Sequence, residues 1–204
     1  MKEIFLLRVV ALLASLLFCT CVSAKPYSTL SQPVADAPDV VEFFSFYCGP
    51  CYLFIEQYPV VAEINRVLPE GTVTRYHVGA MGKYGSELSE AWAVATVTGV
   101  SDLIQLPLFR AVQRDRVINK PSDIYAVFRE VGISPEMYES ARHSMMVKAF
   151  IARQDEMVRA FQVSSTPSIY VKGRYYIENG GVKAETPEGY VAAYARLVSE
   201  LMNI

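Results

Sequence analysis

Cysteine is scarce in this chain, and that scarcity excludes one class of exported protein. The 204 residues contain four cysteines, and two of them, Cys19 and Cys21, belong to an N-terminal segment that is predicted to be removed. The remaining pair, Cys48 and Cys51, is too small a set for a disulfide framework. The stability of the folded chain must therefore come from a hydrophobic core, which about 180 residues are enough to form.

An excess of charge of one sign is also absent. The chain has 19 basic and 21 acidic residues, and without Lys2, Arg8 and Glu3 the counts become 17 and 20, a net charge of −3. This balance excludes the basic surface that nucleic acids require, so no nucleic-acid partner is expected. It favours protein clients that are bound through apolar contacts.

A hydrophobic run long enough to cross a membrane is missing as well. Residues 9–18 are almost wholly apolar and follow the positive charges of Lys2 and Arg8, while residues 22–24 are small enough for a cleavage site. Because a membrane span needs roughly 20 apolar residues, residues 1–24 are predicted to be a cleaved signal peptide, with no stable membrane insertion. Lipid attachment at Cys19 or Cys21 is disfavoured, because the residues that precede them are not uniformly small.

What the chain does contain is a pair of thiols at the predicted start of a helix, a place that favours redox chemistry. Cys48-Gly49-Pro50-Cys51 follows an apolar and aromatic run, residues 40–47, that predicts a buried strand. At the start of a helix, the first sulfur lies near unpaired N–H groups and the positive end of the helix dipole, which favour its thiolate. Such a pair can exchange a disulfide with another protein through a mixed disulfide.

The rest of the chain predicts an α/β fold interrupted by helices. A helix follows the cysteines, is broken at Pro59 and leads to a strand over residues 72–78, which forms a parallel unit with the first strand. A hairpin over residues 168–177 turns at Gly173, and a last helix begins at Thr186. Between these parts, helices are expected to begin near Ser86, Ser101, Ser122, Ser134 and Met145.

Several motifs together resemble the DsbA family of the thioredoxin superfamily. Besides the cysteine pair and Ser165-Thr166-Pro167, they are residues 41–47, 68–71, 76–78, 91–95 and 107–109. The resemblance implies a thioredoxin fold with an inserted α-helical domain. The thioredoxin-like domain would comprise residues 25–79 and 147–204, and the insertion residues 80–146. The resemblance also implies that the protein is located in the periplasm.

The resemblance assigns roles to the residues that match its motifs. Cys48 would be the exposed nucleophile and Cys51 the buried resolving thiol, with Gly49 and Pro50 completing the active-site loop. Pro167 would be a cis proline. Thr166 before it would offer backbone hydrogen bonds to an extended client peptide.

Glu42 has two interpretations. A carboxylate within an apolar strand is costly to bury without a partner, so it could simply face solvent. The resemblance implies instead a buried proton acceptor near Cys51, with Arg75 on the neighbouring strand as its partner. Members of the family usually have lysine at that position, and arginine does not release its proton.

The function implied is that of an exported thiol:disulfide oxidoreductase that introduces disulfides into cysteine-containing client proteins. It would act as a monomer without a cofactor and be reoxidised by a membrane partner of the DsbB type. Gly49 and Pro50 depart from the Pro-His pair of well-known family members. Since histidine helps to stabilise the thiolate, its absence predicts a weaker oxidant, and a disulfide reductase or isomerase stays an alternative.

A different class of function, metal binding by the two thiols, is also open. It would need further ligands near the pair, and only His77, His143 and carboxylates are available, none of them close in sequence. We therefore expect no metal site.

Overall fold

The structure is a computed structural model that describes residues 25–68 and 73–204. The predicted signal peptide lies outside these residues, as do Thr72 of the predicted second strand and part of the 68–71 motif. Among the described residues, no helix combines the length and the hydropathy of a membrane span.

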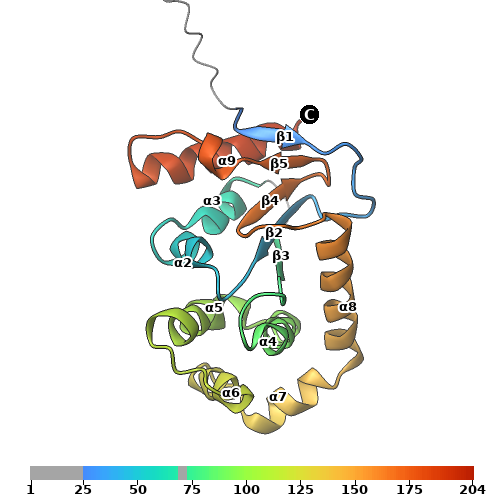
Figure 1. The fold of residues 1–204 in the computed structure, drawn as a ribbon, viewed down its shortest axis with the longest axis vertical. Helices are drawn as coiled ribbons and strands as arrows, with labels where there is room; N and C mark the ends of the chain where they lie inside the picture. The colour runs from blue at the N-terminus through green and yellow to red at the C-terminus, as the bar shows by residue number, and fades with distance from the viewer. Residues whose placement is uncertain (1–24, 69–72) are drawn as a thin grey trace, which may run out of the picture.

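A five-stranded sheet forms one half of the molecule (Figure 1). Its strands are β1 (Tyr27–Thr29), β2 (Val40–Phe44), β3 (Thr74–His77), β4 (Ser168–Val171) and β5 (Tyr175–Ile177). They lie in the order β1-β5-β4-β2-β3, with β2 and β3 parallel and the other pairs antiparallel. The predicted parallel pair and the predicted hairpin are confirmed. The edge strand β1 was not predicted, because three mostly exposed residues carry no alternating pattern.

The helices follow the predicted sequence of segments, with the break at Pro59 confirmed. They are α2 (Gly49–Glu56), α3 (Val60–Val67), α4 (Gly85–Val97), α5 (Ser101–Phe109), α6 (Pro121–Glu130), α7 (Pro135–Arg142), α8 (Met145–Ala160) and α9 (Pro187–Met202). A π-helical turn, η1 (Arg110–Arg114), follows α5, and a 3₁₀ turn, η2 (Asn179–Gly181), follows β5.

Two predicted helix starts were wrong by a residue or more. The helix predicted to begin at Ser86 begins at Gly85, which is packed so closely on Gly79 that an added Cβ would lie 2.2 Å from the Gly79 carbonyl oxygen. The helix predicted at Ser122 begins at Pro121, because the carboxylate of Asp123 accepts hydrogen bonds from the N–H groups before it. At α6 the carboxylate of Asp123 thus takes the capping role that was predicted for Ser122.

Helices cover both faces of the sheet. Helices α3 and α9 pack together on one face with α2 beside them, and α8 runs along the other face (Figure 1). The side chains of β2 alternate between the two cores, with Val40 in the first and Val41 and Phe43 in the second. This explains why the whole strand is apolar apart from Glu42: it is buried on both sides.

Helices α4 to α7 form a second lobe between β3 and α8 (Figure 1). Its core is continuous with the end of β2, since Phe44, Phe46, Cys48 and Cys51 belong to the same buried cluster as the α4 and α6 side chains. The thioredoxin fold with a helical insertion is therefore the fold of this chain. The cysteine pair lies where the two lobes meet.

Side chains from the helices cover the outer edge of β3. Trp92 of α4 donates a hydrogen bond from Nε1 to the carbonyl oxygen of Arg75 at 2.9 Å. The N–H of His77 donates to Oε1 of Gln154 on α8 at 2.8 Å. An edge strand with satisfied backbone groups does not invite pairing with another chain.

Candidate active site

The turn from β2 to α2 places Cys48 at the start of a helix. Its N–H donates to the carbonyl oxygen of Ser45 at 2.9 Å, and its backbone is extended, as an N-cap requires. Pro50 follows within the first turn, where its missing N–H costs nothing. The sequence therefore forces the chain to bend sharply at the cysteine.

The two sulfurs are joined as a disulfide, with the Cα atoms 5.2 Å apart. The N–H of Cys51 donates to Sγ of Cys48 at 3.1 Å. That contact would persist with the thiolate of the reduced protein, which the helix dipole also favours. The electrostatics of the site thus favour Cys48 as the sulfur that carries negative charge.

Cys48 is less exposed than the resemblance implied. Its exposed fraction is 4%, whereas Cys51 is fully buried at 0%. Gly49 and Pro50 are the exposed residues of the loop. Of the two sulfur-bearing residues, Cys48 is the one with any exposed surface, which agrees with its expected role as the nucleophile and that of Cys51 as the buried resolving thiol. Its small exposed fraction means that access to Cys48 is narrow.

The loop before β4 lies directly over this sulfur. The peptide bond between Thr166 and Pro167 is cis, the isomer that the resemblance implies. The carbonyl oxygen of Thr166 lies 3.2 Å from Sγ of Cys48, while its hydroxyl contacts the sulfur of Met81 at 3.6 Å. The structure thus brings together Cys48, Cys51, Thr166 and Pro167 from distant parts of the sequence.

Asn179 anchors the proline loop from behind. Its Nδ2 donates to the carbonyl oxygen of Pro167 at 2.9 Å, and its Oδ1 accepts from the hydroxyl of Tyr194 at 2.8 Å. Tyr190 also donates to its backbone carbonyl at 3.2 Å, and burial raises the pKa of Tyr190 to about 12, so it stays protonated. No sequence pattern singles out Asn179, because its role depends on a contact twelve residues away.

An apolar groove of about 390 Å³ begins beside the cysteine loop. Residues of α2 and of the start of α9 form its walls, among them Pro50, Leu53, Phe54, Tyr58, Pro187 and Tyr190. Leu53 is 40% exposed and adds apolar surface to the groove. The groove offers apolar contacts to a chain whose cysteine reaches Cys48.

Glu42 and Arg75 are brought together, with Glu42 fully buried and Arg75 partly buried. Their side chains are 0% and 9% exposed, and Nε of Arg75 lies 2.5 Å from Oε2 of Glu42. The guanidinium also donates to Gln105 and lies 4.4 Å from the ring centroid of Phe44. The solvent-facing interpretation of Glu42 is therefore wrong: the carboxylate is on the sheet face that α2, α3 and α9 cover.

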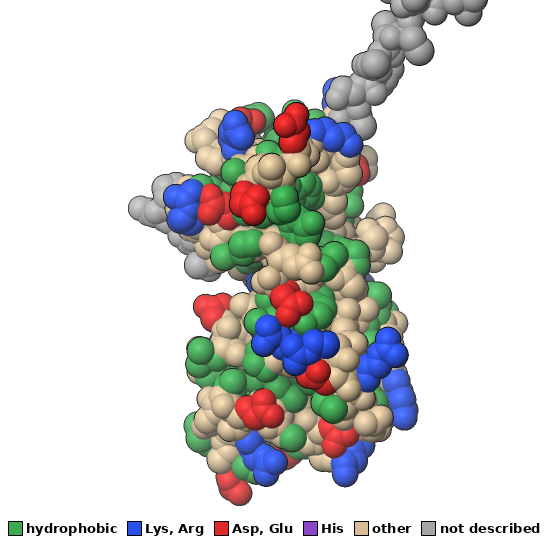
Figure 2. Space-filling view, turned by 90° about the vertical axis from the view of Figure 1, so that its left-hand side faces the viewer, with side chains coloured by type: hydrophobic (Ala, Val, Ile, Leu, Met, Phe, Trp, Pro, Cys, Tyr) green, Lys and Arg blue, Asp and Glu red, His purple; other side chains and the backbone are tan. Residues whose placement is uncertain are grey.

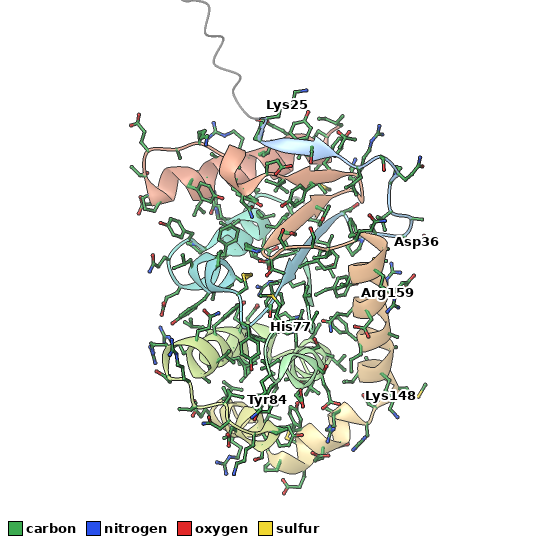
Figure 3. The ribbon with its side chains drawn as sticks, in the orientation of Figure 1. Lys25, Asp36, His77, Tyr84, Lys148 and Arg159 are labelled. Atoms are coloured by element: carbon green, nitrogen blue, oxygen red, sulfur yellow. A yellow bond between two sulfur atoms is a disulfide. The ribbon has the colours of Figure 1, made fainter. Side chains whose placement is uncertain are left out.

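His77 is a core histidine and does not reach the sulfurs through any hydrogen bond in the structure. The residue lies near the middle of the molecule (Figure 3). Its Nε2 accepts from the N–H of Phe46 at 3.0 Å, and its Nδ1 is 2.8 Å from the hydroxyl of Ser89. Burial, with a smaller effect of Arg75, lowers its pKa to about 3. The ring is thus neutral at physiological pH and fixes the turn before Cys48.

Gln113 is a further residue that the sequence analysis missed. It lies in η1, and its carboxamide reaches the carbonyl oxygens of Phe46 and Cys48. A single glutamine in a helical segment carries no signal of its own, because only the fold of the second lobe brings it to the cysteine loop.

The metal-binding alternative would need further ligands beside the two thiols. Within residues 25–68 and 73–204, no three or more His, Cys, Asp and Glu side chains gather as a metal site would need. His143 lies on the surface beside Glu139, far from the sulfurs in sequence.

Comparisons with known proteins agree with this geometry. Residues 39–192 match the family of DsbA-like thioredoxin domains. The chain is 40% identical to the thiol:disulfide interchange protein DsbA of Yersinia pestis, over 100% of this chain and 99% of that protein. It is 41% identical to the DsbA of Pectobacterium carotovorum, over 88% and 87% of the two chains.

Solved structures give the same result. The crystal structure of a DsbA from Klebsiella pneumoniae superposes with a TM-score of 0.86 at 41% identity, covering 89% of this chain and 97% of that one. A Proteus mirabilis DsbA with the non-covalently bound peptide PWATCDS gives 0.85 at 38% identity, with coverage of 89% and 98%. On these matches, and on the cysteine pair at the meeting point of the two lobes, the chain belongs to the DsbA-like thioredoxin domain family.

Proposed function

We propose that this chain is an exported thiol:disulfide oxidoreductase that introduces disulfides into client proteins. A client thiolate attacks Sγ of Cys48, and Cys51 leaves as a thiolate that takes up a proton. The second client thiolate then attacks the client sulfur of the mixed disulfide and releases Cys48. Two electrons pass from the client to the cysteine pair, and the client gains one disulfide. Of the two protons of the client thiols, one goes to Cys51 and the other to water, because Cys48 leaves as a thiolate.

One observation carries the proposal. The disulfide lies at the start of α2 with Sγ of Cys48 3.2 Å from the carbonyl oxygen of Thr166, so the attacked sulfur is next to free backbone of the proline loop. An extended client can pair with that backbone as an added strand. A Proteus mirabilis relative has been solved with the non-covalently bound, cysteine-containing peptide PWATCDS, which supports peptide binding by this chain.

The apolar groove between α2 and α9 supplies the remaining contacts. Figure 2 shows apolar, acidic and basic side chains interspersed on one face of the molecule, without a large field of one charge. Apolar contact, rather than electrostatic attraction, would therefore select clients.

Glu42 is proposed as the proton acceptor for Cys51 when the reduced pair is reoxidised, with Arg75 holding the carboxylate in place. Support comes from its burial, from the contact between the two side chains and from a position on the sheet face that α2 covers. Arg75 does not transfer the proton, since a guanidinium keeps its charge.

Pro50 argues for a weaker oxidant than family members with histidine at that position. Thioredoxin has a reduction potential of about −270 mV and DsbA one of about −120 mV, and we expect a value between them. Net reductase or isomerase activity is the second candidate function, which Gly49 and Pro50 favour.

Residues 1–24 would direct the chain to the periplasm and be cleaved there, and a membrane protein of the DsbB type would reoxidise the cysteine pair. The protein would act as a monomer. Its thioredoxin-like domain would comprise residues 25–79 and 147–204, with residues 80–146 as the inserted domain.

Substitution of each cysteine tests the proposal. Cys48→Ser should abolish disulfide transfer to a reduced peptide, because the attacked sulfur is gone. In Cys51→Ser the remaining Cys48 thiolate can attack the disulfide of an oxidised client peptide, whose second sulfur leaves as a thiolate. This variant should accumulate the mixed disulfide, visible by mass spectrometry, because Cys51 is no longer there to release it. Full activity in Cys48→Ser would end the proposal.

A titration of the cysteine pair against glutathione buffers tests the direction of transfer. An equilibrium potential near that of thioredoxin would defeat the oxidase assignment in favour of the reductase.

A further inference from the structure

We infer that Gln113 is a positioning residue of the redox pair, through which the helical lobe sets the geometry of Cys48. Nε2 of Gln113 donates to the carbonyl oxygen of Phe46 at 2.8 Å and to that of Cys48 at 2.9 Å. Both partners are acceptors only, so the NH₂ group of the carboxamide must face them. One side chain of the second lobe thus holds two carbonyls of the cysteine turn. The inference rests on the proposed function.

The remaining backbone groups of this turn are held from the first lobe. The N–H of Phe46 donates to His77, that of Tyr47 to the hydroxyl of Ser45 at 3.3 Å, and that of Cys48 to the Ser45 carbonyl oxygen. The N–H groups are therefore fixed independently of Gln113. The carbonyl side of the turn depends on Gln113 and on the Cys48–Tyr52 bond of the first turn of α2.

The local fold of the second lobe directs Gln113 to this turn. In η1 the N–H of Asp115 donates to the carbonyl oxygen of Arg110, five residues back, which widens the helix after Pro107. A π-turn changes the direction of the side chains that follow it, and such turns occur often at functional sites. Here the widened turn carries Gln113, whose side chain donates to two carbonyls of the cysteine turn.

Loss of the two Gln113 hydrogen bonds should change the stability of the Cys48 thiolate. The N-cap conformation of Cys48 lets its Sγ accept the N–H of Cys51, and that conformation depends on where its carbonyl points. If the Cys48 carbonyl is no longer held by Gln113, the hydrogen bond from the Cys51 N–H to Sγ of Cys48, which favours the thiolate, becomes weaker. The reduced form becomes less stable relative to the disulfide, so the protein becomes a weaker oxidant.

The test uses Gln113→Glu and Gln113→Met in the full mature chain. Glutamate is of the same shape but cannot donate when ionised and brings negative charge toward two carbonyls. Methionine removes the donors without charge. Gln57→Glu is the matched control, because it adds the same charge at the exposed C-terminal end of α2. The readouts are the equilibrium constant with glutathione and the Cys48 thiol pKa from thiolate absorbance.

We expect Gln113→Glu to shift the equilibrium with glutathione about tenfold toward the disulfide and to raise the Cys48 pKa by about one unit. Gln113→Met should shift both in the same direction but less, and Gln57→Glu should leave both within twofold of the parent. Should Gln113→Glu fail to fold, Gln113→Met decides alone.

Unchanged equilibrium and pKa in the folded variants would overturn the inference, even if the free energy of unfolding fell, since a purely structural role predicts that result. Glutathione exchange by the parent protein distinguishes a failure of this inference from a failure of the proposed function. If the parent does not exchange with glutathione, the proposed function fails; if it does and the variants match it, only the role of Gln113 fails.

Discussion

At the scale of single residues, the site depends on polar groups that are buried and paired. Glu42 and Arg75 form such a pair in the core, where an ion without its partner is costly. His77 is buried and neutral, and its two ring nitrogens bind Phe46 and Ser89. The buried contact between Glu42 and Arg75 and the neutral imidazole of His77 lead to two predictions.

Removing one member of the ion pair should cost more than removing both. Glu42→Gln should lower the free energy of unfolding by about 3 kcal/mol, because it leaves the Arg75 charge buried without a carboxylate. The double variant Glu42→Gln/Arg75→Met should lose less. Urea unfolding of the oxidised proteins at pH 7 measures both, and equal losses in the single and double variants would contradict this account.

His77 should make the protein less stable in acid. Its pKa is about 3 in the folded state and about 6.5 in the unfolded chain, so between these values the unfolded chain binds one more proton. The free energy of unfolding should therefore be greatest above pH 6.5 and fall as pH falls toward 3, by up to about 1.4 kcal/mol per pH unit from this group.

The variant His77→Gln tests that contribution, because glutamine can accept from Phe46 and donate to Ser89 but does not titrate. Unfolding measured at several values between pH 7 and pH 4 should show a flatter dependence on pH in the variant. Parallel curves for the two proteins would argue against a neutral buried imidazole.

At the scale of elements, most starts and ends follow from local chemistry, but some turns are fixed by what packs on them. Gly173 lies in the β4–β5 turn at φ +61, and a Cβ there would lie 2.5 Å from the carbonyl oxygen of Val34. Gly132 after α6 has φ +86 and no atom within 4 Å of an added Cβ. The two glycines share a backbone requirement and differ in packing.

Alanine at these two positions should separate the two effects. Gly132→Ala should cost about 1 kcal/mol from the left-handed backbone alone. Gly173→Ala should cost at least 1 kcal/mol more, because the segment around Val34 must move. Thermal unfolding of the two variants compares them directly. Equal losses of stability would show that the segment around Val34 moves away from the added Cβ without a cost in free energy.

At the scale of the whole molecule, the two lobes share one buried cluster. Trp92 is the single tryptophan of the chain, is 3% exposed and lies in α4 with its ring 4.9 Å from that of Phe44 at the end of β2. Its fluorescence therefore reports on the junction of the lobes. The cysteine pair belongs to the same cluster, so the redox site depends on both lobes being folded.

We expect the lobes to unfold together. Trp92 fluorescence, which follows the junction, and far-UV circular dichroism, which follows the helices, should give coincident urea transitions for the oxidised protein. Two separated transitions would mean that the insertion unfolds as an independent unit. The variant Trp92→Phe, followed by circular dichroism alone, controls for effects of the probe.

The sequence by itself determined what short-range patterns can encode. The buried strand before Cys48, the helix break at Pro59, the cap at Ser134 and the turn at Gly173 all follow from neighbouring residues, and the structure agrees with each. The cysteine pair was visible from its place after a buried strand, whereas the role of Thr166 and Pro167 came from the resemblance, which joins two distant short motifs.

Only the tertiary structure decided which side chains complete the site. Gln113, Asn179 and Met81 reach the cysteine turn or the proline loop from segments far away in the sequence, and a lone amide or methionine has no local pattern. The same holds for the narrow access to Cys48 and for the edge strand β1, which exists only because β5 pairs with it. Hydrogen bonds and burial between distant residues form only when the chain closes on itself, so no stretch of sequence contains them.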